Sequence, residues 1–243
     1  MKVGDLKIKK LSIIIPTFND ASALKNTLSS LSNLPYVDML DVIVVDGNSC
    51  DDTPEVIIEF THIINIFHSA PDTGEYDAMN KGIDLSTAKY LIFLMAGDCL
   101  HQNNKSKKLE SINNPSFVAV FRKNVNAGLD LLRTKPSLYF GLPHCHQGII
   151  YKKPIPYFDL NYKISSDYDH FLNCEYPAKL PFYDAPFFVV YDEGNSGENY
   201  LIRDKEILVI SRKNFGSLVW AVVFCIFQIK HLLKFILRYY YER

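Results

Sequence analysis

The sequence LSIIIPTFND, from Leu11 to Asp20, joins a short apolar run to polar residues that commonly end a strand and begin a helix. Its first five residues are mostly apolar, and such a run bounded by turn residues predicts a buried strand. Asn19 or Asp20 suits the cap of a helix, and leucines then recur at the spacing of one helix face. The stretch therefore predicts a buried strand that leads directly into a helix.

The alternation of strands and helices continues over the first hundred residues. The ranges 41–46, 63–67 and 90–95 are predicted strands, and helical patterns lie between them. This alternation is typical of a mostly parallel sheet covered by helices. We therefore expect an α/β fold with a parallel central sheet.

The overall composition is that of a folded soluble protein. Of 243 residues, 48% are hydrophobic and 22% are charged, which disfavours both a disordered chain and a polytopic membrane protein. The formal net charge of -1 gives no general attraction for nucleic acid, so we expect no nucleic-acid partner. Five cysteines without a CxxC pair favour a reducing, cytoplasmic setting. We expect one main domain over residues 1–200 and a C-terminal helical extension over 201–243.

Polar residues follow the end of each predicted strand. The four strand ends read PTFN, DG, APD and AGD. In an open α/β sheet, ligands bind outside the carboxyl ends of the parallel strands, so these groups should converge on one crevice. A single aspartate there is more often a turn former, but three at one edge favour a binding site. The candidate residues are Pro16, Thr17, Asn19, Asp46, Asp72 and Asp98.

Two common phosphate-binding signatures, GxGxxG and the P-loop, do not occur in the sequence. A bound diphosphate would then need another countercharge, and a divalent cation held by carboxylates is the available one. Mg²⁺ is typically held by one or two carboxylates together with substrate phosphates. Asp98 ends the last predicted strand and is best placed for this role, and Gly97 allows a ligand close to the backbone.

Several motifs, in order along the chain, resemble those of a known family. They are LSIIIPTFND (11–20), VIVVDGNSCDDT (42–53), PDTGEYDAMNKG (71–82), YLIFLMAGD (90–98), PHCHQGIIY (143–151) and SSDYDHFL (165–172). They resemble the family 2 glycosyltransferases, most closely the bacterial branch that builds O-antigen, capsule and colanic-acid-type polysaccharides. The resemblance covers about residues 11–175 and implies the GT-A fold, here followed by a C-terminal amphipathic helix.

The resemblance implies a nucleotide diphosphate sugar as the donor and assigns residues to its nucleotide part. Pro16, Thr17 and Asn19 would line the nucleotide pocket. Asp46 would bind the base or the ribose, and Asp72 would contact the edge of the base.

Other positions would lie nearer the donor sugar. Asn80 and Lys81 would face the donor side, and His146 and Gln147 would lie beside the sugar. Lys81 also follows Asp77 by four residues, so an ordinary ion pair on a helix surface explains these two residues equally well.

The resemblance also implies Mg²⁺ or Mn²⁺ as a cofactor. Asp98 matches the last aspartate of the family's metal-binding DxD-type motif. Residues 95–98 read Met-Ala-Gly-Asp, whereas many relatives carry two or three acidic residues there. We therefore expect poor metal affinity without the donor, and a weak or partial metal dependence.

Asp167 matches the acidic residue that acts as general base in the family. A sugar hydroxyl is a weak nucleophile, so a carboxylate within hydrogen-bond reach must take its proton. With one base and no evident enzyme nucleophile, the implied reaction is a single displacement that inverts the anomeric configuration. Without the motif, a helix cap would be the simplest interpretation of Asp167.

The C-terminal stretch has the pattern of an amphipathic helix. From Phe215 to Tyr240, apolar residues recur at a regular 4,3,4,3 spacing. The continuously apolar part, residues 218–227, is about half the ~20 residues needed to cross a bilayer. Flanking basic residues and terminal tyrosines suit a helix lying on an anionic membrane. A helix packed on the domain, or in the seam of a homodimer, is the alternative.

Together these features predict an inverting glycosyltransferase that acts as a peripheral protein at the cytoplasmic face of the bacterial inner membrane. Its acceptor would be a hydroxyl of a lipid-linked saccharide. Two other classes stay open. A sugar nucleotidyltransferase has a similar α/β core, although PTFN lacks the Gly-rich basic loop of such enzymes. A non-catalytic binding protein is consistent with the reduced acidic motif.

Overall fold

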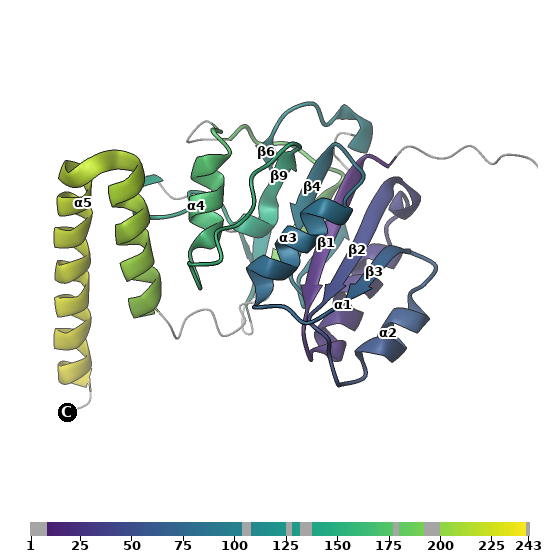
Figure 1. Ribbon diagram of the computed structural model, residues 1–243, viewed down its shortest axis with the longest axis horizontal. Helices are drawn as coiled ribbons and strands as arrows, with labels where there is room; N and C mark the ends of the chain where they lie inside the picture. The colour runs from purple at the N-terminus through teal and green to yellow at the C-terminus, as the bar shows by residue number, and fades with distance from the viewer. Residues whose placement is uncertain are drawn as a thin grey trace, which may run out of the picture.

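The chain folds as a six-stranded sheet between layers of helices, with a pair of helical segments at one end (Figure 1). The computed structural model describes residues 9–103, 108–124, 128–131, 138–176, 180–191 and 200–241. Within these ranges, only the backbone is described at 110, 122–124, 128–130 and 234–241.

The central sheet is parallel over four adjacent strands. Its order is β3-β2-β1-β4-β9-β6, and β9 is antiparallel to both β4 and β6. The bounds are β1 Leu11–Thr17, β2 Leu40–Asp46, β3 Ile64–Ser69, β4 Tyr90–Phe93, β6 Ser116–Phe117 and β9 Ile149–Lys152. Thr17 lies opposite Asp46 in the β1–β2 register, so the two strands end at one edge. The predicted α/β fold with a mostly parallel sheet is confirmed.

Alternate residues of the parallel strands face opposite layers of helices. Ile13 and Val42 belong to the apolar core that includes α1 and α2, whereas Ile14 and Ile43 belong to the core that includes α3. Burial on both faces explains why these strands are almost continuously apolar. The α-helices are α1 Ala21–Ser32, α2 Thr53–Glu59, α3 Glu75–Leu85 and α4 Ser166–Asn173, and the 3₁₀ helices are η1 Val37–Met39, η2 Leu109–Ser111, η3 Leu138–Phe140 and η4 His146–Gly148.

A smaller sheet continues from the end of β4. Its strands are β5 Cys99–Gln102, β7 Val120–Asn124, β8 Gly128–Leu131 and β10 Phe187–Tyr191, in the order β5-β10-β7-β8. The turn at residues 94–98 joins the two sheets, and the Leu94 N–H donates to the Ile14 carbonyl at 2.9 Å. The turn that ends in Asp98 is therefore fixed beside the carboxyl end of β1.

The C-terminal helix α5 runs from Tyr200 to Tyr241 and is broken at Gly216. Gly216 has φ 82° and ψ 177°, a conformation that suits glycine and ends the helical path. Residues 200–215 form a first arm and residues 217–241 a second arm, which lie side by side (Figure 1). The sequence pattern predicted one continuous helix from about residue 215, whereas the structure has a helix that begins earlier and turns back.

The second arm is apolar on two opposite sides. Val223 and Phe227 are buried in the protein core. Leu218 and Leu232 lie on the other side and are 82% and 59% exposed. By length and composition, the stretch Tyr200–Leu233 is apolar enough to cross a membrane, with a mean hydropathy of 1.7 over its best 18-residue window. Gly216 divides that stretch into the two arms.

Candidate active site

Backbone hydrogen bonds join the carboxyl ends of the three strands β1, β2 and β3. The Gly47 N–H donates to the Thr17 carbonyl at 2.9 Å, and the Ala70 N–H donates to the Asp46 carbonyl at 3.0 Å. Pro16 lies within β1 opposite Val45 of β2. The residues expected at the nucleotide pocket therefore share one edge of the sheet, as the register of parallel strands requires.

The carboxylate of Asp46 is fixed from several directions. It is 3% exposed, and Oδ2 accepts from the Ser69 hydroxyl at 2.6 Å and from the Ser49 N–H at 3.1 Å. The Ser49 hydroxyl donates to Oδ1. Hydrogen bonds to a charged acceptor are stronger than neutral ones, so this set holds Asp46 in one orientation.

Asn19 links the turn after β1 to the turn after β2. Its φ is 49°, in the left-handed region that asparagine tolerates. Its Oδ1 accepts from the Cys50 N–H at 2.8 Å, and its own N–H donates to the Ser49 hydroxyl at 2.8 Å. Asn19 therefore positions the same serine that contacts Asp46.

Asp72 and Phe18 both pack against Gly47. A Cβ atom on Gly47 would lie 2.9 Å from Asp72 Oδ2 and 3.0 Å from the Phe18 ring, so a larger residue there would displace one of these side chains. Asp72 Oδ1 accepts from the Gly74 N–H at 3.0 Å. The Phe18 side chain is 60% exposed and offers an aromatic surface beside Asp72. We use the name donor edge for the residues at the ends of β1, β2 and β3, which are Pro16, Thr17, Phe18, Asn19, Asp46, Gly47 and Asp72.

Lys81 and Asn80 differ in their relation to the donor edge. Lys81 Nζ donates to the Pro71 carbonyl at 2.9 Å, next to Asp72, and it also lies 3.4 Å from Asp77 Oδ2. The helix pair with Asp77 is therefore present, and the donor-side role of Lys81 stays a prediction. The Asn80 amide instead exchanges two hydrogen bonds with the Phe158 backbone, at 2.8 and 3.0 Å. Its assignment to the donor site stays a prediction.

Asp98 lies at the same end of the sheet but is deeply buried. It is 1% exposed, and its Oδ2 accepts from the Met95 N–H at 3.1 Å. Gly97, with φ 101°, forms the turn and donates its N–H to the Thr27 hydroxyl at 2.9 Å. These contacts bring the turn against α1.

The residues at Asp98 fit a divalent cation only if a substrate supplies further ligands. Within the described residues, no group of three His, Cys, Asp or Glu side chains is arranged to hold a metal ion. Mg²⁺ commonly takes one or two carboxylates and completes its shell with phosphate oxygens and water. A single carboxylate matches that mode of binding in the presence of a diphosphate.

Asp167 lies in the first turn of α4, close to α3. Its Oδ1 accepts from the Tyr168 N–H at 2.8 Å, and its side chain is partly exposed. The buried Tyr76 of α3 donates its hydroxyl to the Ile164 carbonyl at 2.7 Å, which ties α3 to the segment that leads into α4. The segment before Asp167 therefore sits against the start of α3.

Sequence reasoning misses Glu75, the first residue of α3. Desolvation by surrounding protein, followed by the negative charge of Asp167, raises the pKa of Glu75 from 4.5 to about 7. The side chain is nevertheless exposed to solvent by surface area. Both observations hold for a carboxyl group with protein on most sides and water on one. The only signal in the sequence is its place inside the motif PDTGEYDAMNKG.

His146 and Gln147 are buried in η4. The His146 ring stacks on Phe93 of β4 with a centroid distance of 5.3 Å, and Nδ1 hydrogen-bonds with the Tyr151 hydroxyl at 3.2 Å. Burial, with a smaller contribution from His170, lowers the pKa of His146 to about 3, so the ring is neutral. Its Nε2 has no hydrogen-bond partner in the described part of the chain. Gln147 Oε1 accepts from the Cys145 thiol at 2.9 Å.

Comparison with known proteins identifies the family. The sequence profile of glycosyl transferase family 2 matches residues 12–171. The chain belongs to glycosyl transferase family 2. The matched range includes the donor edge, Asp98 and Asp167. The chain is therefore a glycosyltransferase, and not a sugar nucleotidyltransferase or a non-catalytic binding protein.

Related proteins support the same conclusion. The chain is 32% identical over 216 residues to a PGL/p-HBAD biosynthesis glycosyltransferase of Mycobacterium tuberculosis (strain ATCC 25177 / H37Ra), which covers 81% of this chain and 82% of the relative. It is 31% identical over 99 residues to the poly(ribitol-phosphate) beta-N-acetylglucosaminyltransferase TarP of Staphylococcus aureus (strain N315). This aligned stretch covers 39% of this chain and 30% of TarP.

Solved structures confirm the GT-A fold of this glycosyltransferase. S. aureus TarS 1-349 in complex with UDP matches with a TM-score of 0.57 and 16% identity, over 85% of this chain and 66% of that one. The mannosyltransferase PcManGT from Pyrobaculum calidifontis, in complex with GDP-Man and Mn²⁺, matches with a TM-score of 0.56 and 15% identity, over 83% and 62%. At such identities the likeness shows the fold alone.

Proposed function

We propose that this glycosyltransferase moves a sugar from a nucleotide diphosphate sugar to a hydroxyl of a lipid-linked saccharide, with inversion at the anomeric carbon. The observation that carries the proposal is the donor edge, where Asp72 and the exposed Phe18 ring pack against Gly47, the residue after Asp46. Solved structures of similar fold bind UDP, UDP-GlcNAc, or GDP-Man with Mn²⁺, which supports a nucleotide sugar as donor. The lipid-linked acceptor and the O-antigen, capsule or colanic-acid branch stay predictions.

In the proposed reaction, Asp167 acts as the general base. Its carboxylate takes the proton of the acceptor hydroxyl while the hydroxyl oxygen attacks the anomeric carbon, and the nucleoside diphosphate leaves from the opposite face. A single displacement of this kind inverts the configuration. Asp98 is the residue that would hold Mg²⁺ or Mn²⁺, and such an ion offsets the charge of the diphosphate when bound. The neutral ring of His146 stacks on Phe93 of β4, and Gln147 is buried beside it in the same 3₁₀ helix. Both residues support the side of the proposed site that lies next to β4.

A panel of UDP-, GDP- and dTDP-sugars, incubated with the enzyme and a lipid-linked saccharide extract, tests the proposal. We expect one donor to release its nucleoside diphosphate in step with labelling of the lipid fraction. If pyrophosphate is added, its consumption with formation of a nucleoside triphosphate and a sugar 1-phosphate would instead indicate a nucleotidyltransferase. No release from any donor, in a protein that binds nucleotide, would contradict the proposal.

The exposed side of the second arm supports peripheral contact with a membrane at the cytoplasmic face. Its apolar side chains have no cover from the described part of the chain. Part of the basic charge expected to bind lipid is used internally, because Lys213 pairs with Asp169 and Lys230 with Asp204, each at 3.0 Å. The apolar side chains, more than charge, should therefore drive the contact.

Two matched double variants test this contact. Leu218→Glu with Leu232→Glu places charge on the exposed side of the second arm, and Ile58→Glu with Leu160→Glu alters side chains that are 71% and 50% exposed elsewhere. We expect only the first pair to abolish flotation with vesicles of phosphatidylglycerol and cardiolipin. If the first pair instead converts a dimer to a monomer in light scattering and leaves flotation unchanged, the stripe is a dimer seam and the membrane proposal is wrong.

A further inference from the structure

Glu206, in the first arm of α5, binds the backbone immediately before α4. Its Oε1 accepts from the Lys163 N–H at 2.7 Å. Its Oε2 accepts from the Ile164 N–H at 3.0 Å and from the Ser165 N–H at 2.9 Å. One carboxylate therefore satisfies three consecutive N–H groups, and its negative charge lies at the positive end of the α4 dipole.

The same segment is held from other directions. The Tyr76 hydroxyl of α3 donates to the Ile164 carbonyl at 2.7 Å, so both polar groups of this residue are engaged. Further along α4, the buried Asp169 accepts from Lys213 of the first arm at 3.0 Å. The segment 163–165, which ends two residues before Asp167, is therefore clamped between α3 and the first arm.

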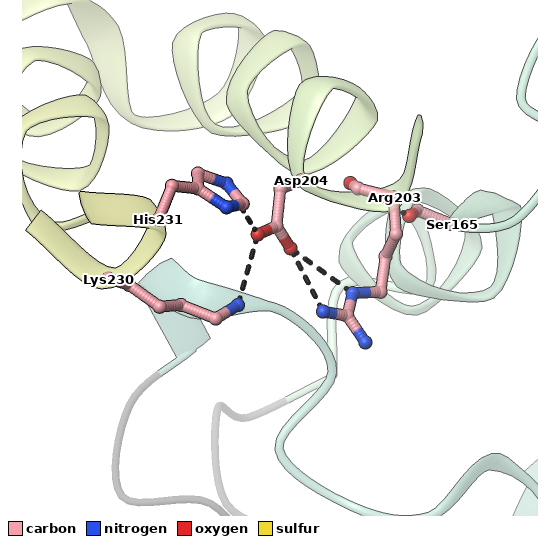
Figure 2. Close-up of polar contacts among 5 residues, drawn as sticks. All are labelled: Ser165, Arg203, Asp204, Lys230 and His231. Atoms are coloured by element: carbon pink, nitrogen blue, oxygen red, sulfur yellow. Dashed lines mark hydrogen bonds and ion pairs between the residues drawn. The ribbon is translucent and has the colours of Figure 1, made fainter. Parts of the chain in front are cut away.

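The second arm fixes the position of the first. Figure 2 shows Asp204 of the first arm between Lys230 and His231 of the second arm, with Arg203 on its other side. Lys230 Nζ lies 3.0 Å and His231 Nε2 3.2 Å from Asp204 Oδ2, and the carboxylate is 4% exposed. Arg203 binds the other oxygen at 3.1 Å. These ion pairs hold the two arms of α5 together close to Glu206, the residue that binds the backbone before α4.

We propose that Glu206 is a positioning residue for Asp167. It fixes the backbone entering α4, so that the Asp167 carboxylate faces the acceptor hydroxyl at the distance that proton transfer requires. The inference rests on the proposed role of Asp167 as general base. A misplacement of about 1 Å near a reacting group costs about 10²-fold in rate, so a residue that never touches substrate can have a large effect on kcat.

The test compares Glu206→Ala and Glu206→Gln with the control Glu59→Ala, in which an exposed glutamate paired with Lys25 is removed from α2. We expect Glu206→Ala to lower kcat by about 10–100-fold per UDP-binding site, with the Kd for UDP within about twofold of the wild-type value. Glu206→Gln keeps one carbonyl oxygen that accepts two of the three N–H groups, so it should recover part of the loss. Glu59→Ala should change neither quantity.

The outcomes separate positioning from simple stabilisation. A merely structural residue would lower Tm and the number of UDP-binding sites but leave kcat per site unchanged, and that result would overturn the proposal. If Glu206→Ala does not fold, Glu206→Gln carries the test, and a lowered Tm with a wild-type kcat per UDP-binding site overturns the proposal.

A double variant separates this proposal from the proposed function. If Glu206 acts through Asp167, then Glu206→Ala should cost nothing further in the Asp167→Asn background. A full additional loss there would overturn the positioning role. Normal turnover by Asp167→Asn alone would instead show that the general base is wrong.

Discussion

The carboxyl groups on the two sides of the candidate active site are held in different ways. At the donor edge, Asp46 accepts hydrogen bonds from Ser49 and Ser69, and Asp72 accepts one from a backbone N–H. On the side of α3 and α4, Glu75 accepts no hydrogen bond from the described residues, and it lies within the electrostatic influence of Asp167.

This difference separates binding from proton transfer. Hydrogen bonds to a carboxylate fix its direction, which suits a group that must recognise a nucleotide in one orientation. Desolvation and a nearby like charge favour the protonated form, as at Glu75. A carboxyl group with a raised pKa is a common feature of sites that perform acid–base chemistry.

The largest expected effect belongs to Asp167. Asp167→Asn keeps the shape of the side chain but removes the base, so kcat for sugar transfer should fall by about 10²–10⁴-fold. The Kd for UDP, measured by calorimetry, should stay within about twofold, because the donor edge lies on other elements. Asp84→Asn, near the other end of α3, is the control and should leave transfer unchanged. An equal loss of UDP binding and turnover in Asp167→Asn would remove the distinction between the two sides.

A smaller effect is expected at the donor edge. Asp46→Ala removes a charged acceptor and leaves the Ser49 and Ser69 hydroxyls without their partner. The Kd for UDP should rise about 10–100-fold, since a hydrogen bond to a charged group is worth about 1.5–3 kcal/mol. Unfolding in urea should also become easier by about 2 kcal/mol for the same reason. Wild-type UDP affinity in a folded Asp46→Ala protein would show that the nucleotide binds elsewhere.

The donor edge could be anticipated from the sequence, because parallel strands end together and their polar residues follow directly. Thr17, Asp46 and Asp72 are placed in this way by local pattern alone. Glu75 and Glu206 could not be anticipated, because their surroundings come from segments far away in the chain. Glu206 binds residues 163–165, about forty positions earlier, and no periodicity encodes that contact.

The C-terminal helix shows another limit of the sequence pattern. The apolar spacing continues without interruption past Gly216, so periodicity predicts one helix where the structure has two arms. The break lies at Gly216, and the second arm is held in its turned-back position by packing of Val223 and Phe227 against the core and by the pairing of Lys230 with Asp204. These contacts exist only in the folded chain.

The smallest expected effect is the change that Glu75→Gln makes to the pH dependence of stability. It directly tests the difference between the donor edge and the side of α3 and α4. The pKa of Glu75 is raised in the folded protein, from 4.5 to about 7, so between these values the folded state binds more protons than the unfolded state. The stabilisation from this group is therefore complete below pH 4.5 and is lost as the pH rises through 7. Glutamine does not ionise, so the variant should lack this decline.

The Glu75 side chain is exposed to solvent, so screening limits the effect to about 1 kcal/mol or less, which is about 2–4 °C in Tm for a chain of this length. Thermal unfolding of wild type and Glu75→Gln from pH 4.5 to pH 8 should give Tm curves that separate as the pH rises, with the variant higher above pH 7. Glu59→Gln, on an exposed helix surface, should follow the wild-type slope. Parallel curves for all three proteins would mean that Glu75 is an ordinary solvated carboxylate, and the two sides of the site would then hold their charges alike.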